Sequence, residues 1–204
     1  MFAGRKLFIF DLDGTLVDSS PLHARAFDAA LAPVGLSVDY ETVAGLTTER
    51  AIDRITAAAE VTLDPEHHAR LCATKRAEAG RLLEAELEAL PGAVEFVRAA
   101  RARVACALAT SASPGSVDIA LSRTGMTGWF NPVITAADVV RGKPDPETFL
   151  LALKAHGCNP GDALVFEDSA SGLAAAAAAG IAAVRIGPNT PDWFALSAML
   201  DGAP

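Results

Sequence analysis

The sequence predicts an α/β protein in which a doubly wound parallel sheet is interrupted by an all-helical insertion. Two observations carry this prediction. From Pro91 onward, helical patterns alternate with short apolar runs, which is typical of right-handed βαβ units in a parallel sheet. Between residues 18 and 88 only helical patterns and turns occur, although a strand precedes them. We therefore expect a core of residues 1–17 plus 89–204 and a helical cap domain of residues 18–88.

The elements of the core follow from apolar runs and from the helical patterns between them. The first strand is expected at Leu7–Phe10, four large apolar residues of which two are aromatic. Further strands are expected at 104–109, 133–134, 163–166 and 182–186. Helices are expected at 93–101, 114–124, 146–156 and 171–179. This alternation describes a Rossmann-like sheet with helices on both faces.

Three helices are expected in the insertion, because apolar residues recur there at three- and four-residue spacing. They span 21–32, 48–59 and 64–90, and the last mixes charged residues with leucine and alanine as a solvent-facing helix does. Ser20 is the expected N-cap of the first of these helices, with Pro21 at its first position. The insertion is therefore predicted to be a small helical domain of its own.

Composition excludes several classes of function. The 204 residues carry a formal net charge of −8, which argues against nucleic-acid binding. No apolar run reaches the about 18 residues needed to span a bilayer. Asp11 and Asp13 end the N-terminal apolar run too early for a signal peptide, so a cytoplasmic protein without a membrane partner is expected. The three cysteines fit neither a disulfide framework nor a zinc site. A monomer or a homodimer is expected.

Two aspartates directly after the first strand are the most informative feature for chemistry. Asp11 and Asp13 are two residues apart, so in an extended backbone both carboxylates point to one side. Gly14 then lets the chain turn away. Like charges held that close repel one another unless a cation or a shared proton compensates them. The pattern favours a reactive metal–carboxylate site over a solvated turn.

Other polar side chains follow the remaining strands, at the edge where ligands bind in an open parallel sheet. They are Thr110 and Ser111, Lys143, and Glu167 with Asp168. Together with the first pair, the carboxylates would place up to four negative charges near one lysine. A hard divalent cation resolves this imbalance, and Mg²⁺ suits a few carboxylates combined with water and a phosphate oxygen. Hydroxyl groups and backbone N–H groups at a helix start can hold further phosphate oxygens.

Four segments together resemble the motifs of the haloacid dehalogenase-like (HAD) hydrolase superfamily. They occur in the family's order and cover nearly the whole chain: Phe8–Thr15, Thr110–Ser111, Gly142–Pro146, and Phe166–Ser169 with Gly172. The helical insertion after the first motif is similar to the type 1 cap of subfamily I, in the group that contains phosphoglycolate phosphatases and β-phosphoglucomutases. Each motif alone is moderately specific, and the set of four is strongly so.

The resemblance implies a role for each motif residue. Asp11 is expected to be the nucleophile that forms an aspartyl-phosphate, and Asp13 the acid and base that protonates the leaving oxygen and then activates water. Lys143 is expected to partner both the phosphate and Asp11. The Mg²⁺ ligands are expected to be the carboxylates of Asp11 and Asp168 and the backbone carbonyl of Asp13. Glu167 is either a further metal ligand or a hydrogen-bond acceptor behind the ligands.

Contacts to phosphate and substrate are expected from two places. In the core, Thr110, Ser111 and the turn at Gly14 are expected to bind the phosphate group. In the cap domain, His23 lies one turn into the first helix and Lys75 lies on the long helix. Each of these two is either a substrate contact or an ordinary residue of a helix surface.

Departures from other motif patterns of the superfamily narrow the activity. Its dehalogenases lack the second aspartate, so Asp13 argues against dehalogenation. Its phosphonoacetaldehyde hydrolases need a lysine early in the cap, and the segment 45–50 has none. Its β-phosphoglucomutases carry an arginine in the corresponding loop, where Thr48 stands here with Arg50 close by. Thr48 and Arg50 are therefore candidate substrate contacts.

The expected function is Mg²⁺-dependent hydrolysis of a small phosphorylated metabolite, of the sugar-phosphate or phosphoglycolate type, through an aspartyl-phosphate. The alternative is a phosphosugar mutase similar to β-phosphoglucomutase, which shares the first half-reaction. A non-catalytic phosphate-binding module is a remote alternative. It predicts the loss of Asp11, Asp13 or Lys143, and all three are present.

Overall fold

The computed structural model describes residues 1–202 and confirms the predicted α/β class. Within these residues, five strands form one parallel sheet in the order β3-β2-β1-β4-β5. The strands are β1 (Leu7–Phe10), β2 (Ala105–Ala109), β3 (Val133–Ile134), β4 (Ala163–Glu167) and β5 (Ala182–Arg185). The central strand β1 pairs on both edges, with Phe8 level with Cys106 of β2 and Leu164 of β4. The segment that follows β1 is therefore anchored from both sides.

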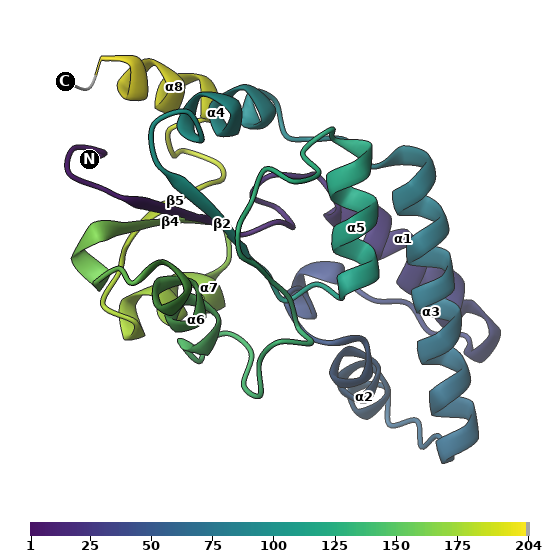
Figure 1. Ribbon diagram of the computed structural model, residues 1–204. Helices are drawn as coiled ribbons and strands as arrows, with labels where there is room; N and C mark the ends of the chain where they lie inside the picture. The colour runs from purple at the N-terminus through teal and green to yellow at the C-terminus, as the bar shows by residue number, and fades with distance from the viewer. Residues whose placement is uncertain (203–204) are drawn as a thin grey trace. The chain divides into compact units, whose positions relative to one another are not determined.

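Helices cover both faces of the sheet (Figure 1). On one face lie α6 (Glu147–His156) and α7 (Ala170–Ala178), and on the other lie α4 (Ala93–Ala100) and α8 (Trp193–Asp201). α5 (Pro114–Arg123) joins β2 to β3, and a 3₁₀ turn at Pro160–Asp162 leads into β4. This is the doubly wound arrangement that the alternation of helices and strands predicts.

Side chains of β1 alternate between the two faces, as they do in any pleated strand. Leu7 and Ile9 are buried in one cluster with Phe149 of α6. Phe8 and Phe10 point the other way and belong to an aromatic group whose other members are Phe2, Phe96, Phe130, Phe166 and Trp193. An unbroken apolar run is what a strand buried on both faces requires.

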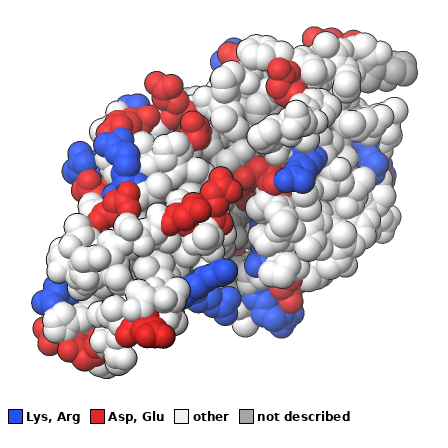
Figure 2. Space-filling model, turned by 180° about the vertical axis from the view of Figure 1, so that it is seen from behind, with Lys and Arg blue, Asp and Glu red and all other residues white. Residues whose placement is uncertain are grey.

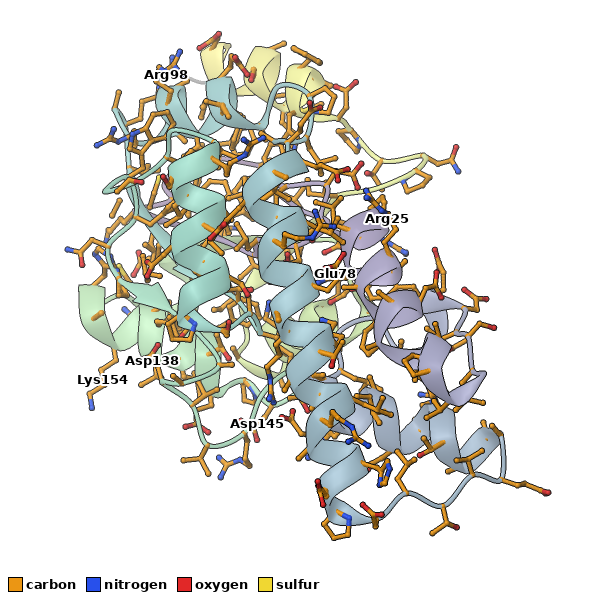
Figure 3. All side chains as sticks on the ribbon, turned by 90° about the vertical axis from the view of Figure 1, so that its right-hand side faces the viewer. Arg25, Glu78, Arg98, Asp138, Asp145 and Lys154 are labelled. Atoms are coloured by element: carbon orange, nitrogen blue, oxygen red, sulfur yellow. The ribbon has the colours of Figure 1, made fainter. Side chains whose placement is uncertain are left out.

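The chain divides into two compact units, one made of Met1–Asp18 and Glu88 onward and the other of Ser19–Leu87. The second unit holds α1 (Ser20–Leu31), α2 (Thr48–Ala58) and α3 (Pro65–Glu86), with 3₁₀ turns at Ala32–Val34 and Tyr40–Thr42. Phe27, Ile52 and Leu71, one from each helix, are buried in its own core. Figure 3 shows Arg25 and Glu78 on the neighbouring helices α1 and α3.

Two helix boundaries in this unit differ from the sequence prediction. α1 begins one residue earlier than expected, so Ser19 and not Ser20 occupies the N-cap position. α3 ends at Glu86 and not at 90, because the chain turns extended and Ala89 forms a bridge with Val17. Pairing with a distant segment thus overrides the helical pattern at its end.

α8 has no counterpart in the sequence prediction. Its N-cap Asp192 accepts a hydrogen bond from the Ala195 N–H at 2.8 Å. Trp193, Leu196 and Leu200 are buried, and the helix packs against α4. A capping residue followed by apolar residues at helical spacing is a helix signal, so the information is present in the sequence.

Charges of both signs are mixed on the face that Figure 2 shows. On the face drawn in Figure 2, acidic and basic side chains are interspersed and do not form one broad basic area. Among the helices of residues 1–202, none combines the length and the apolar character needed to cross a membrane.

Candidate active site

Backbone hydrogen bonds hold the predicted site residues at the carboxyl edge of the sheet. The Asp11 N–H continues the ladder beyond β1 by donating to the Phe166 carbonyl at 3.0 Å. Beyond β2, the Thr110 N–H donates to the Ile134 carbonyl at 3.0 Å. Side chains presented from paired strands are held more precisely than side chains on free loops. The first two motifs are therefore on rigid supports.

Lys143 lies between two buried carboxylates. Its Nζ donates to Asp11 Oδ1 at 2.6 Å and to Glu167 Oε2 at 2.7 Å. The exposed fractions of the side chains are 4% for Lys143, 8% for Asp11 and 1% for Glu167. Charge-assisted hydrogen bonds of this kind are about twice as strong as neutral ones. One ammonium therefore fixes both carboxylates in a nearly closed site.

Burial dominates the protonation of this cluster. It raises the pKa of the Asp11 carboxyl well above its ordinary range, and the Glu167 charge raises that pKa further, while Lys143 opposes both effects. Burial alone would lower the pKa of Lys143, but the charges of Asp11 and Glu167 outweigh it and leave the pKa raised. Lys143 is therefore a permanent positive charge at neutral pH.

Asp168, directly after β4, is held by the turn that follows Asp13. The Thr15 hydroxyl donates to Asp168 Oδ1 at 3.0 Å. Gly14 has a φ of +78°, and a Cβ at this position would collide with the Asp168 carboxylate, so glycine is required. Burial, reinforced by the Glu167 charge, raises the pKa of Asp168 to about 6. The structure thus places the predicted Gly14 turn directly against a predicted metal ligand.

Both carboxylate oxygens of Glu167 accept hydrogen bonds from within the protein. Oε1 accepts from the Ser169 N–H at 3.0 Å and from the Ser169 hydroxyl at 2.8 Å, while Oε2 accepts from Lys143. Ser169 is also the N-cap of α7, where its Oγ accepts from the Gly172 N–H at 3.0 Å. Of the two roles expected for Glu167, this geometry favours the acceptor behind the ligands.

The carboxylates of this edge fit a divalent cation. One oxygen from each of Asp11, Glu167 and Asp168 lies within 4.8 Å of the others. The Lys143 ammonium pairs with Asp11 and Glu167, and its one positive charge leaves two negative charges uncompensated when all three carboxyls are ionised. Carboxylate oxygens are the donors that hard divalent cations prefer. Asp11 and Asp168 as donors, together with the charge deficit to which Glu167 contributes, therefore agree with a metal site.

Three further predicted residues lie at the same edge. Asp13 is half-buried, and its backbone pairs with that of Val17 in an isolated β-bridge within the turn after β1. Thr110 is buried, and its hydroxyl accepts from the Ala112 N–H at 3.0 Å. Ser111 is exposed. The Thr110 hydroxyl is thus used to shape the loop, and Ser111 is the more accessible of the two hydroxyl residues.

The predicted substrate residues of the second unit differ in their surroundings. Lys75 is buried, with Nζ 3.4 Å from His23 Nδ1 and 4.7 Å from the centre of the Phe27 ring. The interpretation of Lys75 as a solvent-facing charge is therefore wrong. Lys75 lies on α3, and it is buried because α3 packs against α1. Thr48 is half-buried at the start of α2, and Arg50 is exposed.

Three residues that support the site were not predicted to do so. Thr15 lies inside the first motif, and Ser169 precedes Gly172 by three residues, which is a capping pattern. Both signals could have been used. Trp193 is different: its indole Nε1 donates to the Thr15 carbonyl at 3.0 Å, across 178 residues of sequence. No sequence pattern connects these two positions.

A parallel α/β sheet whose carboxyl edge carries a lysine-paired carboxylate and a cluster of acidic oxygens describes a class of enzymes that act on phosphate groups with a divalent cation. The model of the haloacid dehalogenase-like hydrolase family matches residues 5–180. The chain belongs to this family, which confirms the resemblance that its motifs indicate.

Similar proteins match over most of the chain. Fructose-1-phosphate phosphatase YqaB of Escherichia coli (strain K12) is 34% identical over 182 residues, which cover 87% of this chain and 94% of the relative. The crystal structure of a predicted phosphoglycolate phosphatase from Haemophilus somnus 129PT has a TM-score of 0.82 at 26% identity and covers 95% of this chain and 89% of its own. β-Phosphoglucomutase from Clostridium difficile has a TM-score of 0.78 at 25% identity, with coverage of 94% and 87%.

Proposed function

We propose that this protein hydrolyses the phosphate ester of a small phosphorylated metabolite through an aspartyl-phosphate on Asp11. The observation that carries the proposal is the buried Asp11 carboxylate, held 2.6 Å from the Lys143 ammonium at the carboxyl end of β1. A nucleophile fixed in this way loses little entropy on reaction, and the adjacent ammonium favours both its anion and an incoming phosphate. Membership of a hydrolase family supports the same conclusion.

The proposed reaction has two half-reactions. In the first, an Asp11 oxygen attacks phosphorus while the bond between phosphorus and the substrate oxygen breaks, and Asp13 gives a proton to that leaving oxygen. In the second, Asp13 takes a proton from water, and the water oxygen attacks phosphorus. Inorganic phosphate then leaves, and the Asp11 carboxylate is restored. Lys143 balances negative charge on Asp11 and on the phosphate throughout.

We propose Mg²⁺ as the divalent cation. The carboxylates of Asp11 and Asp168 would hold it together with the backbone carbonyl of Asp13, and Glu167 would stay behind them as the acceptor for Lys143. When bound, the cation supplies neutralisation of charge on the phosphate oxygens. The residues around it keep the acidic oxygens together against their own repulsion, through Lys143 and the Thr15 hydroxyl.

A phosphorylated sugar or a similarly small metabolite is the proposed substrate class. The E. coli relative is named for fructose 1-phosphate, and the H. somnus structure for phosphoglycolate. Ser111 and backbone N–H groups of its loop are proposed to bind phosphate oxygens. In the second unit, the neighbouring pair His23 and Lys75 is proposed to contact the rest of the substrate. Thr48 and Arg50 are further candidates.

A phosphosugar mutase is the second candidate, because the C. difficile structure shares the fold over most of the chain. Such an enzyme returns the phosphoryl group to a sugar hydroxyl and not to water. Thr48 stands where the mutase pattern has an arginine, which favours hydrolysis. The reaction products distinguish the two candidates directly.

A panel of phosphorylated sugars, sugar alcohols and short acids, assayed for released inorganic phosphate, tests the proposal. Wild-type protein is expected to hydrolyse at least one ester with Mg²⁺ and none with EDTA. Asp11→Asn lowers the rate by about 10³-fold or more, whereas Asp118→Asn, an exposed position on α5, leaves it unchanged. A rate that is the same in Asp11→Asn and wild type contradicts the proposal.

The same panel separates the alternatives. Isomerisation of a hexose phosphate in the presence of a bisphosphate primer, with little phosphate released, identifies a mutase. Phosphate binding without turnover of any ester identifies a non-catalytic module. Either result replaces the proposed hydrolase activity.

A further inference from the structure

The C-terminal helix α8 makes a buried polar contact with the first motif. The indole Nε1 of Trp193 donates to the backbone carbonyl of Thr15 at 3.0 Å. Both residues are closed to solvent, with exposed fractions of 2% for Trp193 and 0% for Thr15. A buried donor and a buried acceptor are each costly to leave unpaired, so the two groups hold one another in place.

Thr15 connects this contact to the acidic cluster. Its hydroxyl donates to Asp168 Oδ1 at 3.0 Å, and the preceding Gly14 lies against the same carboxylate. The turn itself is tight, because the Leu12 carbonyl accepts from the N–H groups of Thr15, Leu16 and Val17. A shift of the Thr15 peptide would therefore move the hydroxyl that orients Asp168.

The Trp193 side chain is held in place by close packing against its neighbours. Its ring lies 4.9 Å from that of Phe96 and 5.5 Å from that of Phe166, measured between centroids. Gly92 has a φ of +82°, and a Cβ there would lie 3.1 Å from Trp193 Cβ, which shows how closely α8 approaches the start of α4. Arg103 pairs with Asp201 at the other end of α8.

Packing alone does not require tryptophan at this position. Any large aromatic ring can fill space among phenylalanines, whereas only the indole N–H meets the Thr15 carbonyl. We propose that Trp193 is a positioning residue for the metal site, acting through Thr15 on the orientation of Asp168. This inference rests on the proposed function, because it takes Asp168 to be a metal ligand.

Trp193→Phe tests the inference, since it keeps an aromatic ring and removes the N–H. The readout is Mn²⁺ binding to the full chain without substrate, followed by electron paramagnetic resonance of free Mn²⁺. Loss of a hydrogen-bond partner of a metal ligand costs about 10–100-fold in affinity, so we expect about threefold to tenfold for a residue one step further away. The KM for substrate at saturating metal is expected to stay within about twofold, because Trp193 does not touch the substrate.

Two matched variants separate positioning from stability. Leu196→Ala weakens the same helix without touching Thr15 and should lower the unfolding midpoint while leaving Mn²⁺ affinity unchanged. Trp129→Phe removes the other tryptophan, which packs beside Arg98 and Arg101, and should also leave affinity unchanged. If Leu196→Ala weakens Mn²⁺ binding as much as Trp193→Phe does, Trp193 is a packing residue only and the inference fails.

A measurement on the metal-free protein checks the contact itself. The chain has two tryptophans, so single substitutions assign both indole N–H signals in a ¹⁵N-edited NMR spectrum. We expect the Trp193 indole hydrogen to exchange with deuterium far more slowly than that of Trp129. Equal exchange overturns the inference and leaves the proposed function standing. Failure of the wild-type chain to bind Mn²⁺ overturns both.

Discussion

At the scale of single residues, Lys143 shows how the buried charges of the site compensate one another. Its ammonium is almost fully buried and donates to Asp11 and Glu167 at 2.6 and 2.7 Å. Each of the three charges would be costly to bury alone, and together they are tolerated because they compensate one another. The residue that aligns the proposed nucleophile is therefore also a structural residue.

Replacement of Lys143 should affect stability and activity together. Lys143→Gln leaves two buried carboxylates without a counter-charge, so we expect a loss of about 3–5 kcal/mol in the free energy of unfolding. Phosphatase activity should fall below detection. Denaturant unfolding and the phosphate-release assay measure the two effects. Lys154→Gln, on the exposed face of α6 where Figure 3 shows its side chain extending outward, is the control and should change neither quantity.

A double variant separates the two effects of Lys143. The double variant Lys143→Gln with Glu167→Gln removes one of the two carboxylates that Lys143→Gln leaves without a counter-charge. It should recover part of the lost stability without recovering activity. Recovery of activity in the double variant would mean that Lys143 serves only to neutralise Glu167.

Site residues could be predicted where the motif itself carries the chemistry. The location of Asp11, Lys143 and Asp168 at one edge could be predicted, because each follows a strand and parallel strands bring their carboxyl ends to the same edge. The role of Glu167 could not be predicted, since it depends on which oxygens Lys143 and Ser169 occupy. Such choices are made by side-chain geometry that spacing does not encode.

The junction of β4 and α7 governs the site at the scale of elements. Glu167 ends the strand, Ser169 caps the helix, and Gly172 in the first turn of α7 lies against the Glu167 carboxylate. A methyl group at Gly172 has no space, because its Cβ would overlap the Glu167 side chain. The close approach of helix and strand is thus part of how Glu167 reaches Lys143.

Gly172→Ala should therefore destabilise the protein by about 1–3 kcal/mol, as overpacking of a filled core does. It should also lower kcat, because Glu167 must move away from Lys143. Gly115→Ala, in the first turn of α5 and surrounded by open space, is the matched control. That variant should be neutral or slightly more stable. Equal behaviour of the two alanine variants in thermal unfolding would argue against a tight β4–α7 contact.

Elements could be predicted best where their own pattern is decisive. The apolar run of β1 and the strong helix patterns of α4 and α7 suffice. The end of α3 could not be read in this way, because pairing of Ala89 with Val17 stops the helix. Long-range contacts of this type are absent from any local window of sequence.

Acidity shapes stability at the scale of the whole molecule. The chain has a net charge of −8, and its site gathers two buried carboxylates and the partly buried Asp168 around one ammonium. Burial raises the pKa of Asp168 to about 6, above the ordinary value of 3.8. A carboxyl with a raised pKa adds stability below its ordinary pKa, and that contribution is lost as the pH rises through about 6. The ionised Asp168 carboxylate should therefore lower the stability of the metal-free protein at neutral pH.

Asp168→Asn should remove this loss of stability when EDTA keeps the protein free of metal. At about pH 7.5 we expect a gain of about 1 kcal/mol, which corresponds to about 2–4 °C in the unfolding midpoint. The gain should shrink as the pH falls through about 6 and should vanish below 3.8, where the carboxyl is protonated in both the folded and the unfolded state. Added Mg²⁺ should reverse the order, because only the wild type keeps both ligands. A difference that is independent of pH would show that Asp168 is not the titrating group.

The central claim is that Asp11 takes up the phosphoryl group and Asp13 moves the protons. It is tested most directly by stopped-flow hydrolysis of p-nitrophenyl phosphate with Asp13→Asn, followed by mass analysis of the acid-quenched protein. Nitrophenolate leaves without being protonated, so Asp11 can still attack, whereas water lacks its base. The account predicts a burst of about one nitrophenolate per enzyme molecule and a phosphoryl group on the peptide that contains Asp11. Release without a burst, and with Asp11 unmodified, would contradict it.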